Sequence, residues 1–437
     1  MERSKLAFIV AATALVLGGT FTAGLYSAYK ENLAFRSIFG VWDDAKTLIR
    51  EIPNLTGSAP IRFLRPAMYP GQGVTINLPE AGADDLILLS GFLKDDNKVQ
   101  LIRRDGTIVN EWRLRAHELF ADPTQCRKPP ATNWNAITHG TIANPQGDIV
   151  FSFESCGMIR LDRCGKAVWP ASKELTHHSP NWTEDGGVVI AGSYRVEPGD
   201  SEVIWPFQPP FWEDSLMQYD PNGKLIANLP LTKLFAENGM AAQLTAGNSG
   251  DTWIGGEFHF NDVQQLSTAL APDFPMFVAG DLLMSVRNLN LLMVTDAAVK
   301  KIKWFKTGPW IRQHDPDFQP GGTITMFDNH MDATPDGSRN GGSRIWQVDP
   351  ATDVATVLYG GTPAQHMYSP ERGTHQMLPG GGIMITEAEQ GRSFQVTPDG
   401  KIVWEYVNRW DDKQITWIHD AEVYPADYFK VSDWSCN

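Results

Sequence analysis

The sequence predicts an all-β protein, a six-bladed β-propeller preceded by an N-terminal transmembrane helix and a juxtamembrane helix. Glycine, proline and tryptophan are plentiful, with 39, 29 and 15 residues in 437, which suits short strands joined by tight turns. One strand-turn-strand phrase recurs six times. A chain of this length exceeds one ordinary compact core, so a large repeat architecture is an expected solution. We expect an anchor over residues 1–29, a helix and linker over 30–68, and the propeller over 69–437.

The N-terminal segment has the composition of a membrane helix. Residues Leu6 to Tyr29 are uncharged and mostly apolar, and Arg3 and Lys5 precede them. The run is long enough to cross a bilayer as a helix of about 20 residues. The positive end should stay cytoplasmic, which predicts a single-pass inner-membrane protein with its propeller in the periplasm. A cleaved signal peptide is the competing interpretation, with Tyr26-Ser27-Ala28 as its cleavage site.

The segment from Lys30 to Ile52 predicts a second helix, which Pro53 should end. The four cysteines then bear on the predicted compartment, because an oxidising environment permits disulfides. We expect one bridge among Cys126, Cys156 and Cys164, whose partners the sequence does not identify. Cys436, at the extreme C-terminus, would be left over.

The repeated phrase is an alternating strand, a turn of Asp, Pro or Gly type and a second strand, often closing on tryptophan. The spacing of the copies, roughly 50 to 75 residues, exceeds that of compact propeller blades, so loop insertions are expected. Six copies predict six blades. They begin at Gln100, Met158, Met217, Leu292, Trp346 and Phe394.

A histidine opens a strand before five of the copies, and a sixth histidine follows the last copy. If the C-terminal strand completes a blade begun near Gly71 to Pro79, the ring closes as propellers often do. The first strand of each blade lines the central channel, so six histidines in one phase would crowd one mouth of that channel. They are His139, His178, His259, His314, His375 and His419.

These histidines suggest chemistry, with packing as the alternative. Imidazole has its unperturbed pKa near neutrality, so a histidine fixed at a strand end is a candidate nucleophile, base or metal ligand. A ring of imidazoles could hold zinc or copper, but no tight ligand spacing is present and an arginine shares the site; we expect no metal and no cofactor. The formal net charge of −14 argues against nucleic acid as a partner.

Several motifs resemble those of the bacterial arylsulfotransferases that do not use phosphoadenosine phosphosulfate. The resemblance runs from about Tyr69 to Tyr428 and is most specific between His259 and Asn329. It rests on His259-Phe260-Asn261-Asp262-Val263, Ser285-Val286-Arg287, Gln313-His314-Asp315 and Phe327-Asp328-Asn329. Members of this family are exported six-bladed propellers, which agrees with the number of repeats.

The resemblance also implies roles for individual residues. The family's nucleophilic histidine corresponds to His314, and the residues that hold the sulfuryl oxygens correspond to His259, Asn261 and Arg287. A further family histidine falls on His178, or on its neighbour His177. Where the well-characterised members follow the motif arginine with His-Gln, this chain has Asn288-Leu289, which bears on how the acceptor is positioned.

The sequence therefore predicts a sulfotransferase that moves a sulfuryl group from an aryl sulfate ester to a phenolic acceptor through a sulfohistidine. His139, His375 and His419 are expected to line the substrate site. The alternatives are a non-catalytic membrane-anchored propeller that binds an anionic ligand or a partner protein, and a metal-dependent hydrolase or oxidoreductase. The sequence does not determine the oligomeric state, and a homo-oligomer is one of the alternatives.

Overall fold

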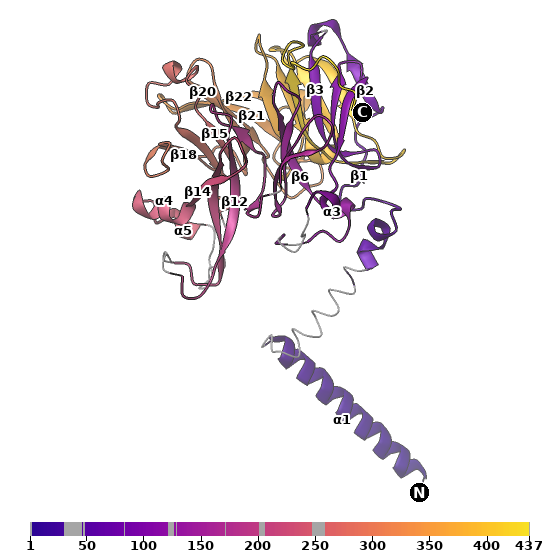
Figure 1. Cartoon of the computed structure of the whole chain (residues 1–437). Helices are drawn as coiled ribbons and strands as arrows, with labels where there is room; N and C mark the ends of the chain where they lie inside the picture. The colour runs from indigo at the N-terminus through magenta and orange to yellow at the C-terminus, as the bar shows by residue number, and fades with distance from the viewer. Residues whose placement is uncertain are drawn as a thin grey trace. The chain divides into compact units, whose positions relative to one another are not determined.

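The structure is a computed structural model of the whole chain, shown in Figure 1. It describes residues 2–29, 46, 49–82, 84–120, 126–127, 129–170, 172–200, 206–246 and 258–436. The chain forms two compact units, Met1–Ile61 and Arg62–Asn437.

The first unit contains the helix α1, Glu2–Tyr29, over the apolar segment. In the described part of the chain we find no helix whose length and apolarity would let it span a membrane. Most of the predicted helix Lys30–Ile52 lies outside the described residues. Its expected end is wrong, because helix continues through Pro53 to residue 55. The backbone N–H groups of Thr56 and Ser58 donate to the carbonyls of Ile52 and Pro53, both at 2.9 Å, and so complete the last turn.

The second unit is a six-bladed propeller, as predicted. Each blade is an antiparallel sheet of four or five strands. The first three blades, innermost strands first, are β28 (Ile418–Tyr424), β3 (Leu86–Leu93), β4 (Asp96–Arg103) and β5 (Ile108–Arg113); β6 (Thr138–Ala143), β7 (Ile149–Phe153), β8 (Gly157–Leu161) and β9 (Ala167–Trp169); and β10 (Leu175–Thr176) with β11 (Asn181–Trp182), β12 (Val188–Val196), β13 (Phe211–Tyr219) and β14 (Leu225–Pro230).

The remaining blades follow the same order. They are β15 (Phe260–Gln265), β16 (Leu282–Val286), β17 (Leu291–Thr295) and β18 (Ile302–Thr307); β19 (His314–Gln319), β20 (Thr323–Asp328), β21 (Arg344–Asp349) and β22 (Val354–Gly360); and β23 (Thr374–Met377), β24 (Ile383–Glu387), β25 (Arg392–Val396), β26 (Ile402–Val407) and β2 (Gly73–Asn77). A short pair, β1 (Arg65–Pro66) and β27 (Gln414–Ile415), lies outside the blades. Each repeated phrase forms the third and fourth strands of its blade.

Two terminal strands close the ring, each by joining a neighbouring blade. The C-terminal strand does pair with another part of the chain, but the predicted pairing partner is wrong. The C-terminal strand β28 pairs with β3, with Tyr424 opposite Leu86. The strand near Gly71 to Pro79, which was expected to receive it, instead adds to the outer edge of the last blade, where β2 pairs with β26. In Figure 1 the yellow C-terminal strands accordingly lie beside β3. Terminal segments therefore complete both neighbouring blades and cover their edges.

The hydrophobic core lies between successive blades. Strands β12 and β13 pack on β16 and β17 through Leu216 and Met284, and similar clusters of buried side chains join each further pair of neighbouring blades. Alternating positions on both faces of a blade are buried, because each blade is covered by two neighbours. Backbone positions at the inner ends of the blades are thereby fixed.

Two disulfides join the four cysteines, Cys126–Cys156 and Cys164–Cys436. The prediction that Cys436 would be left over is wrong. Beyond β28 the chain turns back over the second blade, where the Tyr428 hydroxyl donates to the Ala143 carbonyl at 2.8 Å and the Lys430 N–H donates to the Pro145 carbonyl at 2.7 Å. This return brings Cys436 to Cys164. Two disulfides indicate an extracytoplasmic location.

Candidate active site

The innermost strand region of each blade carries one of the six predicted histidines. His139, His314, His375 and His419 lie on β6, β19, β23 and β28. His178 lies in the link between β10 and β11, and His259 lies immediately before β15. The strand pairing shifts register beside four of these positions, within β6, β15, β19 and β28. Such β-bulges redirect side chains next to functional sites. His178 and His259 also have positive φ values, 65° and 52°, which non-glycine residues adopt rarely.

Four histidines gather around His178. Its Nε2 atom lies 3.0 Å from Nε2 of His259, so one hydrogen is shared between the two rings. The ring centroid of His178 lies 4.5 Å from that of His139 and 5.6 Å from that of His314. The fifth histidine of this group, His177, has its centroid 5.1 Å from that of His178. The cluster therefore joins blades two to five at one end of the channel.

Hydrogen bonds determine the tautomer of His314. The Nδ2 group of Asn329 donates to the carbonyls of Ser369 and Arg372, at 2.7 and 2.6 Å. The Oδ1 atom of Asn329 must then face His314 Nδ1, 2.6 Å away, which makes Nδ1 the protonated nitrogen. His314 Nε2 is buried and has no hydrogen-bond partner among the described residues. The structure thus presents an imidazole lone pair at Nε2.

Arg287 and Asn261 approach the same cluster. Arg287 lines a cavity of about 100 Å³ together with His139, His178 and His259, and its side chain is 8% exposed. A smaller adjoining cavity of about 20 Å³ is lined by His314, Asn261 and His419, and again by His139 and His178. The Nδ2 group of Asn261 donates to the Gln313 carbonyl at 2.8 Å, so β15 also holds the residue that precedes His314. The two cavities share His139, His178 and Arg372.

Burial keeps the cluster neutral. Burial, and then the nearby Arg287, hold the pKa of both His314 and His259 well below the ordinary value. Burial and the neighbouring His139 do the same for His178, and burial together with Arg372 lowers the pKa of His139 to about 4. Burial lowers the pKa of Arg287 only to about 10, so the guanidinium stays charged. An anion entering the cavity would meet a fixed cation and neutral imidazoles.

Two residues at the site are missing from the sequence prediction. Arg372 lines both cavities, lies 3.1 Å from His139 Nδ1 through Nη1, and forms an ion pair with Glu154 at 3.0 Å. Glu154 in turn lies 3.5 Å from His139 Nε2. Arg372 stands three residues before His375 in Arg-Gly-Thr-His, outside the repeated histidine pattern. Gly373 is required there, because a Cβ atom would lie 2.6 Å from the ring of Phe327.

The other predicted substrate-lining histidines differ in placement. His419 lines the smaller cavity and packs on the ring of Phe63. His375 does not line the cavities of the cluster; its Nδ1 lies 3.0 Å from Asp315 Oδ2 and its Nε2 lies 2.8 Å from Thr325 Oγ1. The histidines thus share a phase in the sequence but not a single site.

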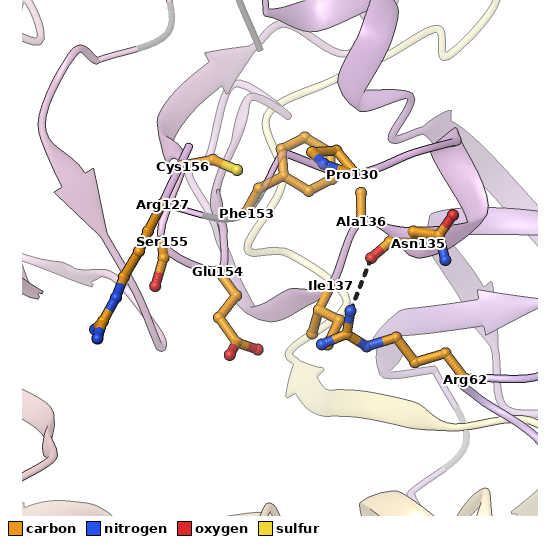
Figure 2. Close-up of a pocket in the computed structure, with 10 residues that line it drawn as sticks. All are labelled: Arg62, Arg127, Pro130, Asn135, Ala136, Ile137, Phe153, Glu154, Ser155 and Cys156. Carbon is orange, nitrogen blue, oxygen red and sulfur yellow. Dashed lines mark hydrogen bonds between the residues drawn. The ribbon is translucent and has the colours of Figure 1, made fainter. Parts of the chain in front are cut away.

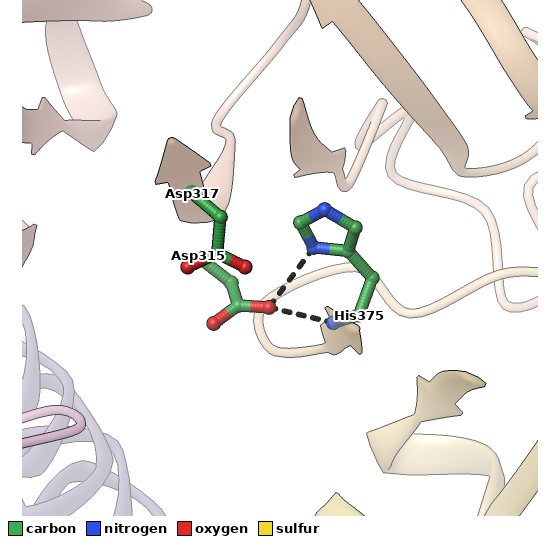
Figure 3. A group of neighbouring side chains, drawn as sticks. All are labelled: Asp315, Asp317 and His375. Carbon is green, nitrogen blue, oxygen red and sulfur yellow. Dashed lines mark hydrogen bonds and ion pairs between the residues drawn. The ribbon is translucent and has the colours of Figure 1, made fainter. Parts of the chain in front are cut away.

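His375 belongs to a group with Asp315 and Asp317, drawn in Figure 3, whose possible ligand atoms lie within 4.8 Å of one another. Such a group could share a cation, although both ring nitrogens of His375 already have partners in the protein. Burial, and then Asp315, raise the pKa of Asp262 and Asp317 well above the ordinary value, and that of Asp420 to about 7. Protons retained on these three carboxyl groups therefore reduce the negative charge around Asp315.

The family model for arylsulfotransferase (ASST) matches residues 142–409. The chain belongs to the arylsulfotransferase family. The matched range contains four of the six channel histidines, Asn261, Arg287 and Arg372; it begins just after His139 and ends before His419. Membership of the ASST family indicates aryl sulfate sulfotransferase activity.

Further comparisons concern the fold. No curated protein matches the sequence significantly. Among solved structures, a protein of unknown function from Bacteroides caccae is 12% identical, with a TM-score of 0.48, over 78% of this chain and 98% of its own. TolB from Acinetobacter baumannii is 10% identical, with a TM-score of 0.42, over 78% and 67%. A streptogramin B lyase is 14% identical, with a TM-score of 0.41, over 80% and 88%. Likenesses of this size carry no argument about the chemistry of this ASST-family chain.

Proposed function

We propose that this protein transfers a sulfuryl group from an aryl sulfate ester to a phenol, and that Nε2 of His314 carries the group between the two half-reactions. The observation that supports this most directly is the Asn329 contact, which leaves an unprotonated Nε2 with no partner among the described residues, on a ring that lines the smaller cavity together with Arg372. A neutral imidazole at that position is a nucleophile.

In the first half-reaction the His314 Nε2–S bond forms while the S–O bond to the aryl group breaks. The electron pair of that bond leaves on the phenolate oxygen. Positive charge develops on the imidazole ring, and the Asn329 carbonyl oxygen, which accepts the Nδ1–H bond, stabilises it. In the second half-reaction the acceptor phenol releases its proton to water and its oxygen bonds to sulfur, while the N–S bond breaks and its electron pair returns to Nε2 of His314. Two steps of this kind predict ping-pong kinetics.

The three sulfuryl oxygens require donors that strengthen as charge develops. Arg287 supplies a planar guanidinium, whose Nε atom is buried and has no partner among the described residues. The His178–His259 pair would supply one further N–H group if the ring that carries the shared hydrogen moves towards the oxygen. Arg372 adds a second guanidinium at the boundary of the two cavities.

We also propose that the enzyme works in the periplasm, tethered to the inner membrane by its N-terminal segment. The two disulfides support an oxidising compartment, and the uncharged run from Leu6 to Tyr29 supports a tether. Alkaline washing of membranes tests the tether. Full-length protein should stay with the membrane pellet, and its release into the supernatant would contradict a retained anchor.

The transferase proposal is tested with 4-nitrophenyl sulfate as donor. Adding phenol should increase nitrophenol release, and phenyl sulfate should form in equal amount. A His314→Ala variant is the control, and a His366→Ala variant, which removes a half-buried imidazole that does not line either cavity, should keep its activity. If phenol-dependent release by the wild type does not exceed that of His314→Ala, the function is instead ligand binding or scaffolding by a propeller.

A further inference from the structure

The acceptor phenol must give up its proton as its oxygen bonds to sulfur, and few groups at the site are able to receive that proton. With the sulfuryl group held by His178, His259 and Arg287, the phenol oxygen would approach through the cavity of about 100 Å³ that these residues line. The described residues that line it carry three imidazoles, two guanidinium groups and two carboxylates. Guanidinium cannot accept a proton, so the imidazoles and the carboxylates are the candidates.

The three imidazoles of this cavity are weak bases. Both ring nitrogens of His139 lie beside the Arg372 guanidinium, at 3.1 and 3.3 Å from Nη1, and a cation at that distance opposes protonation. His178 and His259 face each other through their Nε2 atoms and share one hydrogen. Burial, together with charged neighbours, lowers the pKa of all three rings. A carboxylate is therefore the better candidate.

The carboxylate of Glu154 already has partners. It forms an ion pair with Arg372 at 3.0 Å and lies 3.5 Å from Nε2 of His139. In Figure 2, which draws the neighbouring cavity of about 270 Å³, the Arg62 side chain extends towards the same carboxylate. Burial would raise the pKa of Glu154, but His139, Arg372 and Arg62 hold it well below the ordinary value. Glu154 is therefore a weak base as well.

Glu371 is the second carboxylate that lines the cavity, and its side chain is exposed. Within the part of the chain that the structure describes, it accepts no hydrogen bond and forms no ion pair with a cation within 4 Å. Its charge nevertheless acts at the site: burial and Arg312 lower the pKa of Arg287, and Glu371 opposes that lowering. A carboxylate with both oxygens available thus lies near the guanidinium that would hold the sulfuryl group.

The backbone beside Glu371 is fixed relative to the nucleophile. The carbonyl of the next residue, Arg372, accepts a hydrogen bond from Nδ2 of Asn329 at 2.6 Å, and Oδ1 of the same amide faces Nδ1 of His314. Gly373 then packs against the ring of Phe327. The segment that carries Glu371 is therefore attached to the residue that orients His314.

We propose that Glu371 is the general base of the second half-reaction, an inference that rests on the proposed transferase function. The Glu371 carboxylate accepts the hydroxyl proton as the phenol oxygen bonds to sulfur, and the electron pair of the N–S bond returns to Nε2 of His314. Because the side chain is exposed, the carboxyl group then passes the proton to water and the carboxylate is restored. Glu371 thus connects the acceptor to the solvent.

Two acceptors that differ in ionisation test this role. In mildly alkaline buffer most 4-cyanophenol is ionised, whereas phenol is not. With 4-nitrophenyl sulfate as donor, Glu371→Gln should lower kcat/KM for phenol by roughly 100-fold, the lower end of the range for general base catalysis. It should keep or raise kcat/KM for 4-cyanophenol, because the phenolate has no proton to lose and the amide no longer repels its charge.

The burst of nitrophenol without an acceptor reports the first half-reaction alone. Glu371→Gln should keep the wild-type burst rate, since nitrophenolate leaves without a proton. Glu371→Ala should be slow with phenol, and added formate, which supplies a carboxylate, should restore part of the rate. The matched control is Glu237→Gln, which alters an exposed carboxylate at the end of α4 (Leu231–Glu237) that does not line the cavity; it should change none of these rates.

The outcomes separate the two proposals. Equal slowing with phenol and 4-cyanophenol, or no effect of formate on Glu371→Ala, would overturn the role of Glu371, and a normal burst in the same variants would leave the transferase function standing. If the wild type gives neither a nitrophenol burst nor phenyl sulfate, the transferase function fails, and the role of Glu371 fails with it.

Discussion

The Oδ1 atom of Asn329 lies 2.6 Å from Nδ1 of His314, and two backbone carbonyls hold the amide in that orientation. This relationship assigns the imidazole tautomer and leaves Nε2 as the nucleophilic atom. It also ties the corner after β20 to the loop that carries Arg372, because one of those carbonyls belongs to Arg372. The site is therefore held by contacts between two blades.

Removing the amide of Asn329 should allow the proton of His314 to occupy either ring nitrogen. In Asn329→Ala the Nδ1–H bond is lost and both tautomers become available, so we expect kcat to fall by roughly 100-fold, in the range for loss of one preorganised contact. Asn329→Asp is the informative companion, because a carboxylate beside Nδ1 favours the protonated ring. The acidic limb of its kcat/KM profile should move to higher pH. A purely structural role for Asn329 would lower activity without moving that limb.

The charge and shape of Arg287 should both matter. Guanidinium is planar and donates two parallel hydrogen bonds to oxyanion oxygens, whereas ammonium offers a point charge. Arg287→Lys keeps the charge but should lose roughly 10- to 1000-fold in kcat/KM. Steady-state kinetics with 4-nitrophenyl sulfate measures this loss. Unchanged activity would remove Arg287 from the group that holds the sulfuryl oxygens.

The pH dependence should follow the depressed histidine pKa values. His314 reacts as the neutral base, and burial together with Arg287 favours that form. Activity should therefore persist below pH 6.5, the ordinary value for histidine, and should be lost as pH falls through the lowered pKa. An alkaline limb should appear if the His178–His259 pair must carry an extra proton when sulfate is bound.

A profile of kcat/KM with a slow-leaving aryl sulfate, from pH 4.5 to 9, measures both limbs. An acidic limb centred above pH 6.5 would contradict a buried nucleophile beside a cation. A flat profile would show that no cluster histidine changes protonation in the rate-limiting step, and the acid-base part of the mechanism would fall.

The two disulfides should have separable effects. Cys436→Ser opens the bond between the C-terminal return and the second blade, and we expect the free energy of unfolding to drop by roughly 2–4 kcal/mol with kcat unchanged. Cys126→Ser frees the loop that is fastened beside Glu154, so KM for 4-nitrophenyl sulfate should rise as well. Denaturant unfolding and donor kinetics on the two variants compare these effects. Identical kinetic behaviour would show that Cys126–Cys156 serves stability alone.

Local patterns predicted the number of blades, because each copied phrase encodes its own hairpin, as Met217 to Leu229 does in β13 and β14. The closure of the ring was harder to predict, because β28 and β3 are separated by most of the chain. No local sequence signal distinguishes β3 from β2 as the partner of β28. The same holds for Cys436, which reaches Cys164 only through the return of the C-terminal segment. The sequence pattern predicted six histidines at the inner strands, but β-bulges lie beside only four of them. His375 is on a strand without a bulge and lies apart from His178. Arg372 and Glu154 had no repeat to mark them.

The central claim is that His314 carries the sulfuryl group, and mass analysis after brief exposure to 4-nitrophenyl sulfate tests it most directly. The intact protein should gain about 80 Da, the mass of one sulfuryl group, and peptide mapping should place it on His314. The adduct should disappear when phenol is added, and His314→Ala should gain no mass. An adduct on another residue, or phenol-dependent turnover by the His314→Ala variant at the wild-type rate, would contradict the account.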